Sequence, residues 1–259
     1  MPTVLGPHNA RLETVRELRT PRGRRDHGRF AIEGATLIGE AYRSGLEPRE
    51  IYGTQAALVE FAGQVPAGTP VFQVPDQAFG RLTDVESPSG LLAVLDIPAG
   101  TLETVLTGDG PVLLLAGVND PGNAGTLLRS AEAFGAAGVL FGRGGVDPYS
   151  PKVVRAAMGS LFRLPLAVVD PEPLLAAAAA ARRVIVATDT AGDDLDGATL
   201  PAGAIVAIGN ERRGVRDWLP RWDRAVRIPQ SPRTESLNAG VAGSIVLYEL
   251  DRARREAVK

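Results

Sequence analysis

Two patterns of hydrophobic and polar residues alternate along the chain. Short apolar runs of strand length are separated by stretches in which apolar residues recur every three or four positions, the spacing of one helix face. Residues 112–116 read VLLLA, for example, whereas residues 35–44 place Leu37, Ile38 and Ala41 on one side of a helix. Such alternation predicts an α/β fold.

Residues 1–96 are expected to form a small α/β domain. Its first amphipathic helix is predicted to be capped by Asn9 or Thr14 and to end near residues 21–23, where proline and glycine interrupt the pattern. Shorter strands and helices then alternate. We expect strands over residues 30–33, 51–52, 71–74 and 91–95, and helices over residues 35–44, 56–61 and 76–82.

Residues 97–110 begin with a proline- and glycine-containing stretch and are expected to form a linker. Residues 111–259 then predict a larger domain built on a parallel sheet, because its strand candidates are almost wholly apolar, as strands buried on both faces are. We expect strands over residues 112–116, 139–141, 164–169, 184–187, 204–208 and 225–228, and helices over residues 124–134, 152–158, 173–181 and 236 to about 254.

Composition excludes several kinds of chemistry. The chain has 44% hydrophobic and 22% charged residues, as ordinary globular proteins do. It has no cysteine, which excludes disulfides, thiolate zinc sites and thiol nucleophiles, and its two histidines argue against a metal site. No stretch has the roughly 18–20 apolar residues that span a bilayer. The N-terminus also lacks a hydrophobic signal core, so we expect a cytoplasmic protein without a membrane partner.

Charge is distributed unevenly. The net charge is −2, but residues 1–30 contain seven arginines against Glu13, Glu17 and Asp26. A basic N-terminal segment on a nearly neutral protein is typical of nucleic-acid binding. It is equally typical of a solvated arginine-rich helix face, and charge alone leaves both interpretations open.

Three segments of the second half join strands to polar loops. They read NDPGNAGTLLR (residues 119–129), IGNERRG (208–214) and IPQSPRTESLN (228–238). In an open α/β sheet, loops at the strand ends form the ligand site. None of the three contains the G-x-G-x-x-G spacing of dinucleotide-binding proteins or a phosphate-binding lysine motif, so those nucleotide sites are disfavoured.

Taken singly, each residue in these segments has a structural explanation beside a functional one. Gly209 allows either a close ligand approach or a tight turn, and Ser236 is either the N-cap of the last helix or a catalytic group. Asn123 and Asn238 either bind a substrate or tie loops together. Arg129 lies near an apolar helix face, from which arginines usually extend into solvent.

Together, the segments resemble the three motifs of the SpoU (TrmH-like) family of RNA ribose methyltransferases. The first motif is matched from Asn119 through Asn123 and Gly125 to Arg129. The second is matched by Gly209, Glu211 and Gly214, and the third by Ile228-Pro229 and Ser236-Leu237-Asn238. The resemblance covers the whole chain, since residues 24–41 and 86–94 resemble the substrate-binding domain that precedes many members.

The resemblance implies a catalytic domain with a deep trefoil knot, an obligate homodimer, and S-adenosyl-L-methionine as the methyl donor. By motif position, the cofactor contacts are expected at Gly209, Ile228 and Leu237, with Thr188 as a further candidate. No metal is implied.

The resemblance also implies a catalytic set. Arg129 is expected to clamp a phosphate and to stabilise the developing alkoxide, because a guanidinium is too basic to act as a proton acceptor. The other members of the set, which orient the ribose and the loops, are expected to be Asn123, Glu211, Ser236 and Asn238. The chain departs from the family pattern at Arg212 and Arg213, where many members have a glycine after the glutamate.

These observations predict S-adenosylmethionine-dependent 2′-O-methylation of a ribose in RNA. Ribosomal RNA is favoured over transfer RNA, because the N-terminal domain resembles ribosomal-protein-like RNA-binding modules. Three alternatives remain: a transfer-RNA methyltransferase, an RNA-binding protein that has lost catalysis, and an unrelated α/β enzyme with another nucleotide cofactor.

Overall fold

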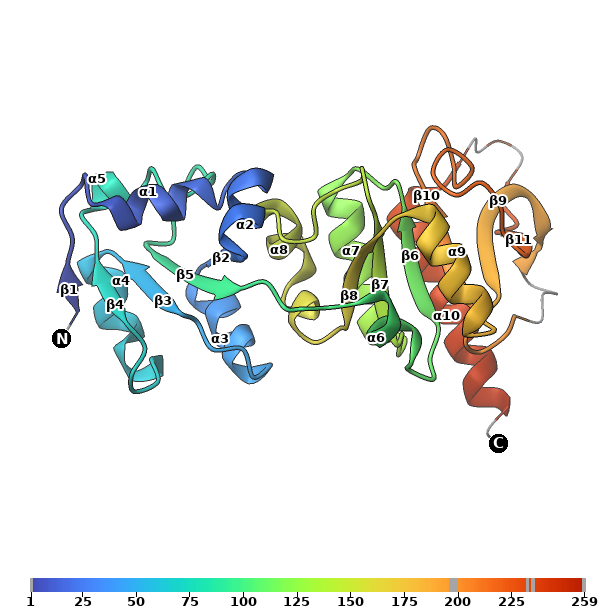
Figure 1. Ribbon diagram of the computed structural model, residues 1–259, viewed down its shortest axis with the longest axis horizontal. Coiled ribbons are helices and arrows are strands. Elements are labelled where there is room, and N and C mark those ends of the chain that lie inside the picture. The colour runs from blue at the N-terminus through green and yellow to red at the C-terminus, as the bar shows by residue number, and fades with distance from the viewer. Residues whose placement is uncertain (1, 196–199, 232, 234–235, 258–259) are drawn as a thin grey trace. The chain divides into compact units, whose positions relative to one another are not determined.

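The computed structural model describes residues 2–195, 200–231, 233 and 236–257. Contacts divide the chain into two units (Figure 1). The N-terminal unit contains Met1–Pro98 together with Tyr149–Phe162, and the C-terminal unit contains Ala99–Pro148 and Arg163–Lys259. Each unit has its own sheet with helices on it, which confirms the predicted α/β class.

The N-terminal unit has a five-stranded mixed sheet. Its strand order is β1 (Thr3–Val4), β4 (Val71–Gln73), β3 (Glu50–Gly53), β5 (Leu91–Asp96) and β2 (Arg29–Glu33). Strands β1, β4 and β3 are parallel, and β5 is antiparallel to both of its neighbours. Figure 1 shows α1 (Ala10–Glu17) and α5 (Asp76–Phe79) on one side of this sheet, and α3 (Ala35–Arg43) and α4 (Gln55–Phe61) on the other. A short 3-10 helix, η1 (Ala62–Gln64), follows α4.

The first helix differs from the prediction. Asn9 caps α1 as expected, its Oδ1 accepting from the Arg11 N–H at 3.0 Å. The expected single helix, however, is two, because Pro21 begins a second helix, α2 (Pro21–His27), instead of ending the first. Thr20 caps α2 by accepting from the Gly23 N–H at 3.0 Å. Proline suits the first helical position, where its missing N–H costs nothing.

Most arginines of residues 1–30 have intramolecular partners. Arg24 is 2% exposed and donates to the Leu18 carbonyl at 2.7 Å. Four others form ion pairs: Arg11 with Glu50, Arg16 with Glu13, Arg22 with Asp26, and Arg29 with Asp96. This segment therefore offers much less free positive charge than its composition indicates.

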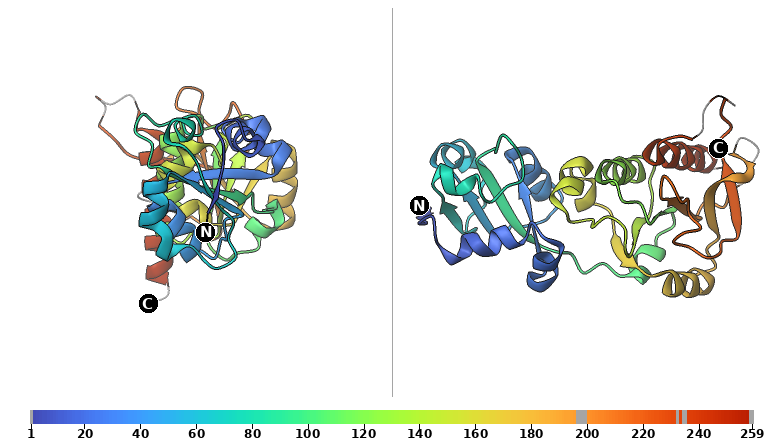
Figure 2. Two further views of the ribbon diagram at one scale, coloured as in Figure 1. Left: turned by 90° about the vertical axis from the view of Figure 1, so that its left-hand side faces the viewer. Right: turned by 90° about the horizontal axis from the view of Figure 1, so that it is seen from above.

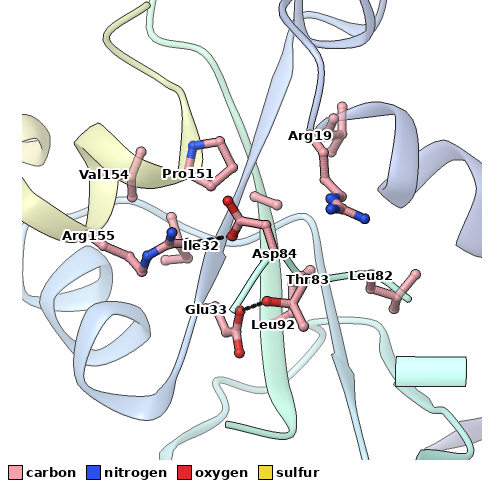
Figure 3. A pocket seen from close by; sticks show the side chains of 12 residues that line it. Arg19, Ile32, Glu33, Leu82, Thr83, Asp84, Leu92, Pro151, Val154 and Arg155 are labelled. Atoms are coloured by element: carbon pink, nitrogen blue, oxygen red, sulfur yellow. Dashed lines mark hydrogen bonds and ion pairs between the residues drawn. The ribbon is translucent and has the colours of Figure 1, made fainter. Parts of the chain in front are cut away.

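The N-terminal unit is completed by a segment from the second half of the sequence. The segment contains α8 (Pro151–Ala157) and a 3-10 helix, η2 (Ser160–Phe162). Phe30, which is fully buried, lies 4.9 Å from Tyr149 and 6.5 Å from Phe162 between ring centroids. Figure 3 shows the ion pair between Arg155 of α8 and Asp84, with 2.8 Å between Nη1 and Oδ1.

The contact with Arg155 lowers the pKa of Asp84. Burial alone would raise the pKa of the Asp84 carboxyl, but the hydrogen bond and charge of Arg155, with a smaller contribution from Arg19, bring that pKa below its ordinary value. The carboxylate therefore stays charged at neutral pH and holds α8 by a charge-assisted bond.

The C-terminal unit has a six-stranded parallel sheet, as predicted. Its strand order is β11 (Arg224–Arg227), β9 (Ile185–Asp194), β10 (Ile205–Gly209), β6 (Val112–Ala116), β7 (Gly138–Gly142) and β8 (Leu166–Val169). Helices α7 (Pro121–Ala133) and α10 (Ala239–Ala257) pack together on one face, and α6 (Leu102–Leu106) and α9 (Pro171–Ala180) on the other (Figure 2). All residues of β6, β7 and β10 are buried, which explains their continuous apolar runs. The trefoil knot stays a prediction.

Helix α6 lies inside the stretch expected to be a linker. Thr101 and Thr104 form a capping box at its start. Val105 and Leu106 are 0% and 7% exposed and join the core of the C-terminal unit. The helix escaped prediction because its five residues are too few to show a period.

Candidate functional site

The loop between β6 and α7 places Asn123 at the carboxyl end of the sheet. Asp120 caps α7 by accepting from the Asn123 N–H at 2.7 Å, and Pro121 occupies the first helical position. Asn123 is thus held in the first turn of the helix, where the residue is 8% exposed. A buried carboxamide needs hydrogen-bond partners, and those partners come from the other two motifs.

Asn238, Asn123 and Glu211 form a chain of side-chain hydrogen bonds, here called the amide relay. The Asn238 Nδ2 group donates to Asn123 Oδ1 at 2.8 Å, and the Asn123 Nδ2 group donates to Glu211 Oε1 at 2.6 Å. Asn238 Oδ1 in turn accepts from the Val241 N–H at 3.2 Å. Since Glu211 can only accept and the Val241 amide can only donate, the orientation of both carboxamides is fixed.

The loop after β10 presents Glu211. Asn210 organises it: its Oδ1 accepts from the backbone N–H groups of Arg212 and Arg213 at 3.0 and 3.3 Å, and its carbonyl accepts from the Gly214 N–H at 2.8 Å. A side chain on Gly209 would meet the backbone at the other end of this loop, because a Cβ there would lie 2.2 Å from the Gly214 carbonyl carbon. Gly209 therefore permits a tight turn. These contacts account for the tight-turn explanation of Gly209, and its role toward a ligand stays a prediction.

A pocket of about 700 Å³ opens beside the amide relay. Six of the predicted site residues line it: Thr188, Gly209, Glu211, Ile228, Ser236 and Leu237. Thr188 uses its hydroxyl to donate to the Ala207 carbonyl at 3.1 Å. Ile208 and Ala239 add apolar surface, and Asp189 adds a carboxylate. The volume falls within the range of about 300–1,000 Å³ that small-molecule sites occupy.

Two predicted residues lie differently from expectation. Arg129 does not line the pocket; it is exposed on α7, and it forms no hydrogen bond or ion pair with the part of the chain that the structure describes. It follows Asn123 by six residues, about 9 Å along the helix axis. Ser236 is not the N-cap of the last helix: α10 begins at Ala239, and Asn238 caps it. The third motif thus caps α10 with the residue that also joins the relay.

Asp120 and Asn210 position the site although the sequence interpretation did not single them out. An aspartate directly before a proline and a helical pattern is a recognisable N-cap signal. Asn210 follows a buried strand and precedes a turn, where asparagine side chains commonly accept from nearby backbone amides. Both signals were available in the sequence.

Within the described residues, no group of three or more histidine, cysteine, aspartate or glutamate side chains is arranged to hold a metal ion. In the same part of the chain, none of the helices has the length and apolar character needed to cross a membrane.

Two stretches of the chain match known protein families. Residues 110–248 match the SpoU rRNA Methylase family, and residues 9–93 match the MRM3-like substrate binding domain. The 23S rRNA (guanosine(2553)-2′-O)-methyltransferase of Bacillus subtilis is 30% identical, with 96% of this chain and 99% of that protein covered. The 23S rRNA (uridine(2479)-2′-O)-methyltransferase of Streptomyces viridochromogenes is 32% identical, with 95% and 91% covered.

Solved structures give the same match over nearly the full chain. The SpoU methyltransferase AviRb from Streptomyces viridochromogenes, in complex with the cofactor AdoMet, has a TM-score of 0.86 at 30% identity, with 96% of this chain and 99% of that one covered. An AdoMet-bound rRNA methyltransferase from Sinorhizobium meliloti has a TM-score of 0.85 at 27% identity, with 99% of each chain covered.

Proposed function

Because the chain belongs to the SpoU rRNA methylase family, we propose that it transfers a methyl group from S-adenosylmethionine to a ribose 2′-hydroxyl in ribosomal RNA. The observation that carries this proposal is the amide relay, which joins side chains from all three motifs beside a pocket of about 700 Å³. Two relatives named as 23S rRNA 2′-O-methyltransferases support ribosomal over transfer RNA.

The pocket residues fit an adenosyl cofactor. Its apolar walls, formed by Ile208, Ile228 and Leu237, suit an adenine ring, and polar groups such as Thr188 and Asp189 suit ribose hydroxyls and an amino group. When bound, S-adenosylmethionine supplies a methyl group on a positively charged sulfur. Gly209, Ile228, Leu237 and Thr188 are the residues that we assign to hold it.

Positioning is the main contribution of the relay. It locks the first turn of α7, the loop after β10 and the start of α10 into one arrangement. A fixed arrangement of this kind lowers the barrier by orienting the reacting groups in advance. We assign Arg129 to an RNA phosphate and to the developing alkoxide, since its guanidinium has no competing partner among the described residues. Ser236, exposed at the pocket, is assigned to the ribose.

The MRM3-like match indicates that the N-terminal unit binds the RNA substrate. The catalytic unit would act as a homodimer. Val241 and Tyr248 are 46% and 44% exposed, and they lie on one side of α10 because they are seven residues apart. A second copy would cover this apolar side, and it would also allow Arg129 of one copy to serve the pocket of the other.

Calorimetric titration tests the cofactor assignment first. Purified protein should bind S-adenosylmethionine and its demethylated product at about one molecule per chain, with NAD as the silent control. Methyl transfer is then measured on ribosomal and transfer RNA. Methylation of transfer RNA alone would overturn the substrate assignment. A protein that binds neither S-adenosylmethionine nor its demethylated product would favour a non-catalytic RNA-binding protein.

Arg129→Ala should lower methyl transfer by at least about a hundredfold while leaving cofactor affinity unchanged. Arg129→Lys is the matched control, because it keeps the charge but not the two parallel donors, and should recover part of the rate. Normal turnover by Arg129→Ala would contradict the assigned role.

Mixing variants tests the homodimer. Sedimentation should give twice the chain mass of 27.2 kDa, and Val241→Glu should shift the protein toward monomer. If Arg129 serves the other copy's pocket, co-expressing Arg129→Ala with Glu211→Ala chains should restore activity that neither variant has alone. If co-expression restores no activity, each Arg129 acts at the pocket of its own chain.

A further inference from the structure

A second pocket, of about 320 Å³, lies at the opposite end of the six-stranded sheet. It is lined by residues that directly precede β9 and β11 and by the end of α9. The lining includes the three arginines Arg182, Arg183 and Arg221, and one carboxylate, Asp223. The first pocket, in contrast, is lined by residues that follow β10 and β11.

Two of these charged residues are already committed to the fold. The Arg183 guanidinium donates to the carbonyls of Leu106, Gly110 and Gly203 at 3.0, 3.0 and 2.8 Å. Burial lowers its pKa, although an arginine stays protonated throughout the usual pH range. Asp223 Oδ2 accepts from the Ile185 N–H at 2.8 Å. Arg183 thus contributes positive charge but few free donors, and one oxygen of the Asp223 carboxylate is occupied by its bond to the start of β9.

Arg182 occupies a position at which glycine is the usual residue. Its φ is 54°, in the left-handed region. The Arg182 N–H bonds to the Ala179 carbonyl at 3.1 Å, and the Arg183 N–H to the Ala178 carbonyl at 2.9 Å. This pair of bonds is the Schellman motif, which ends many helices with a glycine. The chain therefore carries an arginine where glycine would be less strained, and its exposed side chain has no partner within the described residues.

Arg216 and Arg221 flank the pocket's tryptophan. The Arg216 guanidinium carbon lies 4.6 Å from the centroid of the Trp222 ring. A guanidinium over a ring face keeps its N–H groups directed outward in its own plane, where they can meet a phosphate. Arg221 is exposed and, in the part of the chain that the structure describes, has no hydrogen-bond or ion-pair partner.

One loop connects this pocket to the catalytic one. Residues 210–223 run from the end of β10 to the start of β11, and they line the first pocket at one end and the second at the other. Arg212 and Arg213 lie at the catalytic end, and the Arg213 guanidinium has a loose contact with Asp217, at 3.5 Å. Since β10 spans five residues, the two ends of the loop are separated by about 17 Å along the strand.

We propose that Arg182, Arg216 and Arg221 bind successive phosphates of the RNA strand that leaves the catalytic pocket along the 210–223 loop. The proposal rests on the proposed function for the identity of the polyanion. The contacts are to the sugar-phosphate backbone and add affinity without reading sequence.

The test measures binding of a fluorescein-labelled single-stranded RNA of about 20 nucleotides as a function of salt. The variants are Arg182→Gly, Arg216→Gln and Arg221→Gln, singly and together. The triple variant should bind about tenfold more weakly near physiological salt, and the slope of log affinity against log salt should fall by about 2. Arg255→Gln, which removes the same charge from an ion pair with Asp251 on α10, is the matched control and should change the slope little.

Arg182→Gly separates binding from folding. Because glycine relieves the left-handed backbone, this variant should melt at a higher temperature than the parent while binding RNA more weakly. Variants that match Arg255→Gln in affinity and slope, or a parent protein that binds no RNA, would overturn the proposal. Cofactor titration and methyl transfer are measured in parallel. If the protein methylates no RNA but its RNA binding still depends on the three arginines, the proposed function is wrong and the phosphate contacts are supported.

Discussion

The two ends of the six-stranded sheet differ in whether their polar side chains have partners within the protein. At the carboxyl end, Asn238 donates to Asn123 and Asn123 donates to Glu211, and Asn123 is buried. At the amino end, Arg182 and Arg221 are exposed and have no partner among the described residues. Both ends are built from loops on the same strands.

The contrast reflects what each end must do. Orienting a reacting hydroxyl needs groups whose positions are fixed in advance, so their hydrogen bonds are satisfied within the protein. Holding a charged polymer needs accessible positive charge, and its strength comes from released counterions instead of exact placement. Substitutions at the two ends should therefore fail in different ways: loss of rate at one, and loss of salt-dependent affinity at the other.

Gly209→Val should have the largest effect, because it displaces a whole loop at the carboxyl end of the sheet. A Cβ would lie 2.2 Å from the backbone at Gly214 and Val215, so the loop that presents Glu211 must move. We expect a loss of about 3 kcal/mol in the free energy of unfolding, measured with denaturant, and no detectable cofactor binding. The control is Gly214→Asn: Gly214 has a φ of 68° and open space around it, and asparagine tolerates this conformation. An unchanged stability for Gly209→Val would contradict the packing explanation.

Asn123→Asp should come next, because it disturbs the relay alone. The new carboxylate would face Glu211 Oε1 across a contact that is now 2.6 Å, so two negative charges would meet at a nearly buried position. We expect about 2–3 kcal/mol of destabilisation and about a hundredfold slower methyl transfer.

Adding Glu211→Gln to this variant gives the sharper test. The new carboxylate would then accept from the Asn238 amide and from the new glutamine amide, which restores a donor for every acceptor. Recovery of most of the stability in the double variant would support the relay. A strictly additive loss would mean that these hydrogen bonds do not couple the three segments.

Asp84→Asn should have the smallest effect. It adds a third kind of polar group to the comparison of the two sheet ends: a surface charge that is paired within the protein. Its contact with Arg155 is 2.8 Å, and the side chains are 26% and 33% exposed. We expect a loss of about 0.5–1 kcal/mol near neutral pH. Because the folded-state pKa of Asp84 is lowered, this stabilisation is present above the unfolded-state pKa of about 4 and is lost as the pH falls through the folded-state pKa.

Denaturant unfolding at several pH values checks this prediction. The parent and Asp84→Asn should differ by a constant amount between about pH 7 and pH 5, and the difference should shrink below about pH 4. A difference that grows in acid would have the wrong sign for a carboxyl of lowered pKa.

Much of the catalytic unit could be predicted because its signals are local. Continuous apolar runs identify the strands of the parallel sheet, and the polar segments after them identify its ligand-binding end. That Asn123, Glu211 and Asn238 meet follows from the topology, since loops at the carboxyl ends of parallel strands lie along one edge of a sheet. Their hydrogen-bond order does not follow, because it depends on side-chain orientation.

Other features could not be settled from the sequence, because the same residue type serves more than one structure. For Gly209 the sequence leaves a tight turn and a close ligand approach both open, and the contact with the backbone of residues 214 and 215 shows the turn. Pro21 was interpreted as a helix end because proline signals both ends, and only the Thr20 cap distinguishes them. The sequence has 28 lysine and arginine residues. It does not show which of them form ion pairs or hydrogen bonds, so Arg182 and Arg221 could not be singled out.

The split composition of the N-terminal unit has a consequence for the newly made chain. Residues 1–98 leave the ribosome first, but Phe30 has no ring partners until Tyr149 and Phe162 have been added. By then β6 and β7 of the other unit have also emerged. The usual order, in which the first domain folds before the second is synthesised, cannot be completed here. We therefore expect the N-terminal unit to complete its packing only after β6 and β7 have been made.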